Sequence, residues 1–121
     1  MTNNLKRFDV VLVDFGYGHE CEQQGIRPAI IIQNDTGNKY SSTTIVMPLT
    51  KNIKKNPDQP THTLIHKDKD NRLLSDSILL GECMRQVSEN RILKKLGTIN
   101  KMEVKKEIKR VYDASFGEWV V

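Results

Sequence analysis

The chain has 121 residues, with 19 Lys or Arg against 15 Asp or Glu, and therefore a formal net charge of +4. This length fits one domain around a single core, and 37% hydrophobic with 28% charged residues is typical of a soluble globular protein and argues against disorder. No apolar stretch approaches the ~18 residues of a membrane span and no apolar segment follows the first residues. We therefore expect one domain over residues 1–121, in the cytoplasm, with neither a signal peptide nor a membrane helix.

The first half of the chain predicts short strands separated by loops. Runs rich in β-branched and aliphatic residues predict strands over residues 8–15, 29–32 and 43–49. The cluster Asn34 to Asn38 predicts a turn between the second and third strands. Residues 51–60 are polar and contain two prolines, so we expect a loop without regular structure there.

The second half predicts two further strands and then two helices. Strands are expected over residues 61–65 and 77–84. Ser88 can cap a short helix that ends at Gly97 and whose apolar positions are Ile92, Leu93 and Leu96. A second helix follows, with Asn100 and Glu103 as a capping pair and an end at Gly117. Its core-facing stripe is Val104, Ile108, Val111 and Ser115.

This order of elements favours a mainly β fold with C-terminal helices. Strands that follow one another without intervening helices argue against a parallel sheet and for a small antiparallel, barrel-like sheet. The positive charge is concentrated late in the chain, because residues 91–110 carry eight basic side chains and two acidic ones. A solvated helical face is the favoured explanation, and a phosphate-binding stripe is the alternative.

The cysteines and histidines carry no recognisable catalytic or metal-binding spacing. Cys21 and Cys83 form no CxxC, so we expect two reduced thiols rather than a redox pair or a nucleophile. A nuclease with two catalytic histidines is conceivable. However, His62 and His66 on one strand would lie about 13 Å apart, too far for one phosphate to bridge.

Arg27 and Thr50 are the residues best suited to phosphate chemistry. Arg27 precedes Pro28 and the start of a strand, so its guanidinium can present a planar, permanently charged fork at a strand end. Thr50 ends another strand and is followed by Lys51, so a hydroxyl lies beside an ammonium group. Each element alone is common, and the residue types give only a weak signal.

Ordered blocks of sequence around these residues resemble the MazF/PemK family of bacterial toxin endoribonucleases. They include Glu-Gln-x-Gly-Ile-Arg-Pro (Glu22 to Pro28), Ile-Val-x-Pro-Leu-Thr (Ile45 to Thr50) and Pro-Thr-His (Pro60 to His62). Three longer blocks are Arg-x-Asp-Val-Val-Leu-Val-Asp (Arg7 to Asp14), Ile-Gln-Asn-Asp-x-Gly-Asn-Lys-Tyr-Ser (Ile32 to Ser41) and Asp-Ser-x-Leu-Leu-x-Glu-x-x-Arg (Asp76 to Arg85). Together they span roughly residues 7–97, and their order and spacing carry the resemblance.

The resemblance implies a small SH3-like antiparallel β-barrel that works as a homodimer. It implies metal-independent cleavage of single-stranded RNA without a cofactor, leaving a cyclic phosphate and a 5′-hydroxyl, by the catalytic pair Arg27 and Thr50. It also implies a cognate antitoxin with an acidic, disordered tail that neutralises the toxin. The residues expected to line the RNA groove are Glu22, Gln23, Gln24, Lys51, His62, Cys83 and Arg85.

Two alternatives remain at this point. A toxin of the same architecture could act without catalysis, by binding a protein such as a topoisomerase, or the domain could be an inactive nucleic-acid-binding barrel. The sequence also departs from the family pattern at several positions. Phe8 stands where a Gly usually precedes the first strand, and the others are Cys21, Gln24, Cys83 and Gln86.

Overall fold

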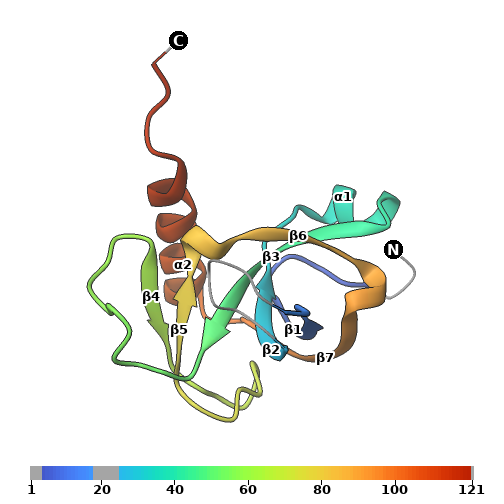
Figure 1. Cartoon of the computed structure of the whole chain (residues 1–121), viewed down its shortest axis with the longest axis horizontal. Coiled ribbons are helices and arrows are strands. Elements are labelled where there is room, and N and C mark those ends of the chain that lie inside the picture. The colour runs from blue at the N-terminus through green and yellow to red at the C-terminus, as the bar shows by residue number, and fades with distance from the viewer. Residues whose placement is uncertain (1–3, 18–24, 121) are drawn as a thin grey trace.

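The computed structural model describes residues 4–17 and 25–120 and consists mainly of short antiparallel strands beside one long helix (Figure 1). In chain order the elements are β1 (Asp9–Asp14), β2 (Ile26–Ile31), α1 (Asp35–Tyr40), β3 (Thr43–Thr50), β4 (His62–Ile65), β5 (Ser77–Leu80), the 3-10 turn η1 (Gly81–Cys83), β6 (Arg85–Ser88), the 3-10 turn η2 (Glu89–Arg91), β7 (Ile92–Thr98) and α2 (Met102–Phe116).

The strands form one antiparallel sheet in the order β4-β5-β3-β2-β1-β7, with β6 also paired to β3. β3 is the central strand: β2 lies along one edge, while β6 pairs with its first half and β5 with its last two residues. Within the described residues no pairing joins β4 to β7, so the sheet stays open. The expectation of a small, mainly antiparallel β fold is confirmed, although the barrel is not closed.

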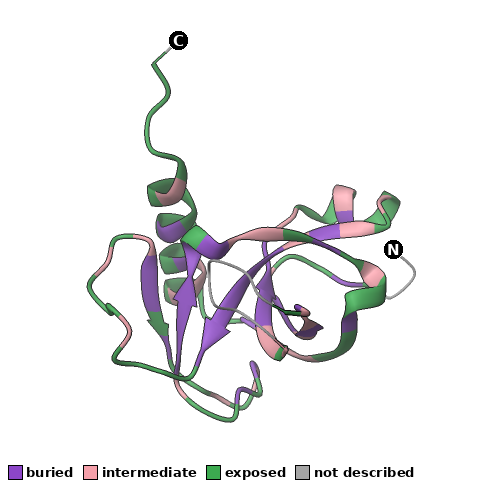
Figure 2. Cartoon of the chain, in the orientation of Figure 1, coloured by how far each residue is buried: buried purple, intermediate pink, exposed green. Residues whose placement is uncertain are grey.

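Alternating side chains build a separate core on each face of the sheet. On β1, Val10 belongs to one cluster, whereas Val11 and Val13 belong to the other. This is the period-2 alternation of a strand that is covered on both faces. Figure 2 shows the consequence, since the central strands are buried along most of their length while the outer surface of α2 and the C-terminal segment are exposed.

Helix α2 covers one face of the sheet with the apolar stripe predicted from sequence. Ile108 and Val111 are 2% and 0% exposed and join the first core cluster, each contributing about 1.5–3 kcal/mol through burial. The helix ends at Gly117, whose φ of +65° lies in the left-handed region, as the sequence indicated. The expected cap is wrong, because the residue that precedes the helix is Lys101 and no side chain caps it.

The short helix predicted between Ser88 and Gly97 is also wrong, because this segment is the turn η2 followed by strand β7. β1 is buried, and the backbone groups along its second edge need partners, which β7 supplies. The β1–β7 register shifts twice, so β7 lacks the clean alternation that marks a strand in sequence. Tertiary pairing has thus overridden a pattern of apolar residues that also fits a helix.

The strand expected over residues 77–84 stops at Leu80. A Cβ added to Gly81 would lie 2.7 Å from the Thr61 carbonyl oxygen and 2.4 Å from Val111 Cγ1, so only glycine lets the chain turn this close to α2. The expected turn after β2 is instead the short helix α1, whose Asn34 side chain accepts a 2.7 Å hydrogen bond from the Gly37 amide. In the part of the chain that the structure describes, no helix is long and apolar enough to cross a membrane.

Candidate active site

The register of the sheet brings the two predicted catalytic residues together. Ala29 pairs with Pro48 between β2 and β3, and extending this register by two residues places Arg27 opposite Thr50. Directly opposed residues of an antiparallel pair point to the same face, with Cβ atoms about 5 Å apart. Residues 23 positions apart in sequence therefore meet where β2 begins and β3 ends.

The Thr50 hydroxyl is positioned by the backbone with its own O–H available to donate a hydrogen bond. Thr50 is 8% exposed, and its Oγ1 accepts a 3.2 Å hydrogen bond from the Asn52 amide. A hydroxyl has one donor and two acceptor sites, so this contact occupies one lone pair and leaves the O–H able to donate to a ligand. The backbone turn after β3 thereby fixes a hydrogen-bond donor beside the Arg27 position.

Arg27 and Lys51 border a cavity of about 410 Å³ at this end of the sheet. Two more cationic side chains, Arg72 from the β4–β5 loop and Lys94 from β7, line the same cavity. Sequence reasoning missed both of these, because nothing in their local sequence indicates that they come together.

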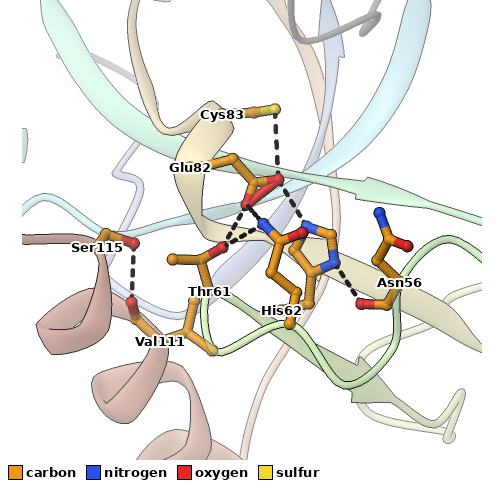
Figure 3. Close-up of polar contacts among 8 residues, drawn as sticks. Asn56, Thr61, His62, Glu82, Cys83, Val111 and Ser115 are labelled. Carbon is orange, nitrogen blue, oxygen red and sulfur yellow. Dashed lines mark hydrogen bonds and ion pairs between the residues drawn. The ribbon is translucent and has the colours of Figure 1, made fainter.

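The predicted RNA-contacting residue His62 is itself buried and lies at the centre of a hydrogen-bond network (Figure 3). Its side chain is 2% exposed; Nδ1 lies 2.9 Å from the Asn56 carbonyl oxygen, and Nε2 lies 2.6 Å from Glu82 Oε1. Both ring nitrogens of His62 therefore face an oxygen that can accept a hydrogen bond. The network ties the loop after β3 to η1.

Glu82 is the acceptor for three donors. Besides His62, Thr61 donates to its Oε2 at 2.6 Å and Gln59 at 3.3 Å. Partial burial acts to raise the pKa of Glu82, but the hydrogen bonds from Thr61 and His62 outweigh it and hold the pKa below its ordinary value. Glu82 was part of a recognised sequence block, yet sequence alone assigned it no role, because its partners lie about 20 positions away.

The remaining predicted RNA-contacting residues occupy different places. Cys83 is buried and disulfide-bonded, so the expectation of reduced thiols is wrong for it, and its sulfur lies 4.0 Å from Glu82 Oε1. Arg85 lies over the ring of Phe15, with its guanidinium carbon 5.6 Å from the ring centroid. The last three, Glu22, Gln23 and Gln24, together with Cys21, lie outside the described residues.

Arg85 shares a face of the sheet with the Arg27–Thr50 pair. It pairs directly with Val46, which lies four residues before Thr50 on the same face of β3. The separation along the strand is about 13 Å, so the two positions belong to one surface but not to one contact. Among the described residues, no group of three or more His, Cys, Asp or Glu side chains could hold a metal ion.

Comparison with known proteins places this arrangement in a family. Residues 6–112 match the family described as PemK-like, MazF-like toxin of type II toxin–antitoxin systems. An Endoribonuclease MazF of Staphylococcus saprophyticus is 43% identical over 113 residues, 93% of this chain and 92% of the relative. One from Staphylococcus epidermidis is 41% identical over the same shares.

Solved structures show the same fold at low sequence identity. A mycobacterial endoribonuclease in complex with its cognate antitoxin has a TM-score of 0.75 at 18% identity, covering 96% of this chain and 99% of that one. MazF from Deinococcus radiodurans also has a TM-score of 0.75 at 18% identity, covering 94% and 97%. The chain therefore belongs to the PemK-like, MazF-like family of toxins of type II toxin–antitoxin systems.

Proposed function

We propose that this protein is a sequence-preferring endoribonuclease that cleaves single-stranded RNA without a metal ion and so inhibits translation and growth. The names of its relatives in the two staphylococci support this activity. The observation that carries the proposal is the β2–β3 register, from Ile31 opposite Val46 to Ala29 opposite Pro48, which sets Arg27 opposite Thr50 when it is extended by two residues. A rigid sheet is a suitable base for such a pair, because it holds both side chains in one geometry.

The reaction that fits this pair is an internal transfer at one phosphodiester. The 2′-oxygen loses its proton and attacks the adjacent phosphorus, the bond to the 5′-oxygen breaks, and that oxygen takes up a proton. The products are a 2′,3′-cyclic phosphate and a 5′-hydroxyl. Negative charge grows on the non-bridging oxygens in the transition state, and a preorganised cation such as Arg27 stabilises it by several kcal/mol.

Thr50 and Arg27 have different roles at the phosphate. A guanidinium has five N–H donors and no acceptor, so the role of Arg27 is to stabilise charge rather than to accept the proton from the 2′-hydroxyl. The Thr50 O–H, oriented by the Asn52 amide, donates to a phosphate oxygen or relays a proton.

The surrounding predicted residues fall into two roles within this proposal. We expect Lys51 and Arg85 to contact the RNA backbone on either side of the catalytic pair, and we expect the same of Glu22, Gln23 and Gln24, which lie outside the described residues. His62 and Cys83 are buried, at 2% and 7% exposure. Their contribution to RNA binding would act through the position of the Glu82 carboxylate between them.

The proposal extends to partners and location. We expect a homodimer in the cytoplasm, neutralised by an antitoxin with an acidic, disordered tail, as a type II system requires a protein antitoxin. Large apolar side chains are exposed around the C-terminal end of α2, which supports association with another protein chain. They include Tyr112, Phe116 and Trp119.

The test is to incubate the purified protein with a long, unstructured RNA in excess chelator and to map the new 5′ ends. Arg27→Lys keeps the charge but loses the planar fork, and Thr50→Val keeps the shape but loses the hydroxyl. Both should reduce cleavage at least 100-fold without changing the circular dichroism spectrum. Thr36→Val on the exposed helix α1 is the matched control and should cleave like the parent.

Two results would overturn the proposal. Full-rate cleavage by the Arg27 and Thr50 variants would remove the assigned pair. No cleavage by a folded parent protein would instead favour a toxin that acts by binding a protein target such as a topoisomerase.

A further inference from the structure

The cavity beside Arg27 combines an apolar floor with a cationic rim. A row of side chains crosses the sheet, because Lys94 and Pro28 both pair directly with Leu12, from opposite sides. Extending the β2–β3 register by one residue adds Leu49 to this row. The floor is thus about three strand spacings, or roughly 14 Å, across. Leu73 and Leu74 of the β4–β5 loop line the same space.

The rim carries positive charge and, in its described lining, no carboxylate. Its four cations are Arg27, Lys51, Arg72 and Lys94. Within the described part of the chain no ion pair engages Lys51, Arg72 or Lys94. Like charges gathered around a cavity repel one another, so this arrangement is stable only at a cost that a bound anion would relieve.

The acidic residues of the same loop face other donors. Asp68 accepts hydrogen bonds from the Asp70 and Asn71 amides and pairs with Lys101. Asp76 accepts from the Lys67 amide and lies 3.3 Å from the ring of His66. These carboxylates hold the loop in shape and leave the cavity rim cationic.

Arg72 occupies a backbone position that disfavours arginine. Its φ is +57°, in the left-handed region that glycine adopts without strain and a long side chain does not. The local fold gives no reason for this choice, since the hydrogen bond at Arg72 is a backbone contact to the Asp68 carbonyl that any residue can make. Glycine would fit this backbone but would lack a side chain, so the exposed Arg72 guanidinium at the cavity rim is the feature that the arginine adds.

From these observations we propose that this cavity is a binding subsite for a nucleotide that flanks the cleaved bond, with Arg72 and Lys94 contacting its phosphate and the accessible apolar side chains of the lining, half-buried Leu12 and Pro28 and exposed Leu74, contacting its base or sugar. The subsite adjoins the catalytic pair at the end of β2 and β3, because Arg27 borders it and Lys51 directly follows Thr50, while its floor lies on the opposite face of the sheet from the one that Arg27 and Thr50 share. The inference rests on the proposed RNA cleavage and extends it by naming residues that the family resemblance does not assign.

The test measures RNA binding without cleavage. The probe is a fluorescein-labelled, mixed-sequence 2′-O-methyl RNA of 12 nucleotides, which lacks the attacking 2′-hydroxyl, titrated by anisotropy at several salt concentrations. Arg72→Gly and Lys94→Gln should each weaken binding about five-fold at 0.15 M salt and lower the slope of log Kd against log salt by about 0.7. Arg72→Gly should leave the melting temperature no lower, because glycine suits that backbone.

Matched controls separate this subsite from general charge effects. Lys69→Gln removes one charge from the same loop outside the cavity, and Lys106→Gln removes one from the exposed side of α2. Both should keep the parent slope. Variants of Arg72 and Lys94 with the slope of these controls would overturn the subsite.

Other outcomes are also informative. If the parent cleaves RNA at discrete sites while all four variants bind alike, the subsite is refuted and the proposed function stands. If the parent neither binds nor cleaves RNA, the proposed function fails. If Arg72→Gly and Lys94→Gln weaken binding of polyglutamate but not of RNA, the cavity serves an acidic protein segment instead, which also refutes the subsite.

Discussion

Replacing Glu82 by alanine should destabilise the fold through His62 rather than through Glu82 itself. The carboxylate is 37% exposed, whereas the imidazole that donates to it at 2.6 Å is 2% exposed. Without the carboxylate, the Nε2–H of His62 is buried with no acceptor, which costs about 1–3 kcal/mol. Loss of the contacts from Thr61 and Gln59, which lie nearer the surface, adds little. For a domain of this size, a total of about 1–3 kcal/mol lowers the melting temperature by roughly 3 to 15 °C.

The effect should depend on pH in a defined direction. Hydrogen bonds from Thr61 and His62 hold the pKa of Glu82 below its usual value near 4.5 in spite of the opposing effect of burial. A group with a depressed folded-state pKa contributes stability that is fully present above the unfolded pKa and is lost as the pH falls through the folded pKa. The difference between parent and Glu82→Ala should therefore be constant above about pH 5.5 and shrink steadily below pH 4.5.

The assay is thermal unfolding followed by circular dichroism, from pH 7 down to the lowest pH at which the parent still folds. Protein concentration is held fixed, because an oligomer's melting temperature depends on it. Glu118→Ala removes a carboxylate from the exposed C-terminal segment and should change little. Glu82→Gln keeps an acceptor for His62 and should lose about half as much. Melting within 2 °C of the parent at pH 7, or a difference unaffected by acid, would refute the reasoning.

Two backbone positions give further predictions. A Cβ on Gly97 would lie 2.2 Å from the Asp70 carbonyl oxygen, so Gly97→Ala should displace the β4–β5 loop and cost more than about 2 kcal/mol in urea unfolding; an unchanged midpoint would contradict the close approach. Phe8 has a φ of +76° and contacts Lys105 through its ring at 5.1 Å. Both Phe8→Ala and Phe8→Gly lose that contact, but Phe8→Gly should be more stable by about 1 kcal/mol because it also relieves the strain; equal urea midpoints would argue against strain.

Phe8 also shows what a sequence pattern can indicate before a structure is known. The family resemblance marked it as a departure, since glycine usually precedes the first strand. The structure gives the reason for the pattern, because the backbone there is left-handed and glycine is the residue that adopts it most easily. The ring of Phe8 packs against the first core cluster, so this chain gains packing at the position where it accepts strain.

Local patterns predicted the elements whose own residues determine them. The stripe of α2 at helical spacing, the glycine that ends the helix, and the β-branched runs of β1 to β3 are properties of short segments, and the structure confirms them. β7 was mistaken for a helix because its identity depends on β1, about 80 residues earlier, which needs a partner along its free edge. The end of β5 likewise depends on how closely α2 approaches Gly81.

In the candidate site, too, some features follow from local sequence and others from contacts between distant segments. Arg27 and Thr50 could be selected by residue type and family resemblance, but their juxtaposition depends on the β2–β3 register. The hydrogen bond between His62 and Glu82 joins two segments that share no local sequence feature. The same is true of Arg72 and Lys94, which line one cavity from different segments. Such pairs become visible only when the sheet is assembled, which is why sequence reasoning named His62 and passed over the other three.

Some polar groups of the described residues form their hydrogen bonds and ion pairs within the fold, and others have donors that no described residue accepts. His62 uses both ring nitrogens within the fold, and Asp68 accepts from two amides and pairs with a lysine, so both groups serve the structure of their loops. Where β2 begins and β3 ends, the Thr50 O–H has no acceptor and Lys94 has no ion pair among the described residues. The surplus of donors and positive charge at this end is what an extended polyanion would satisfy, and a short anion would satisfy only in part.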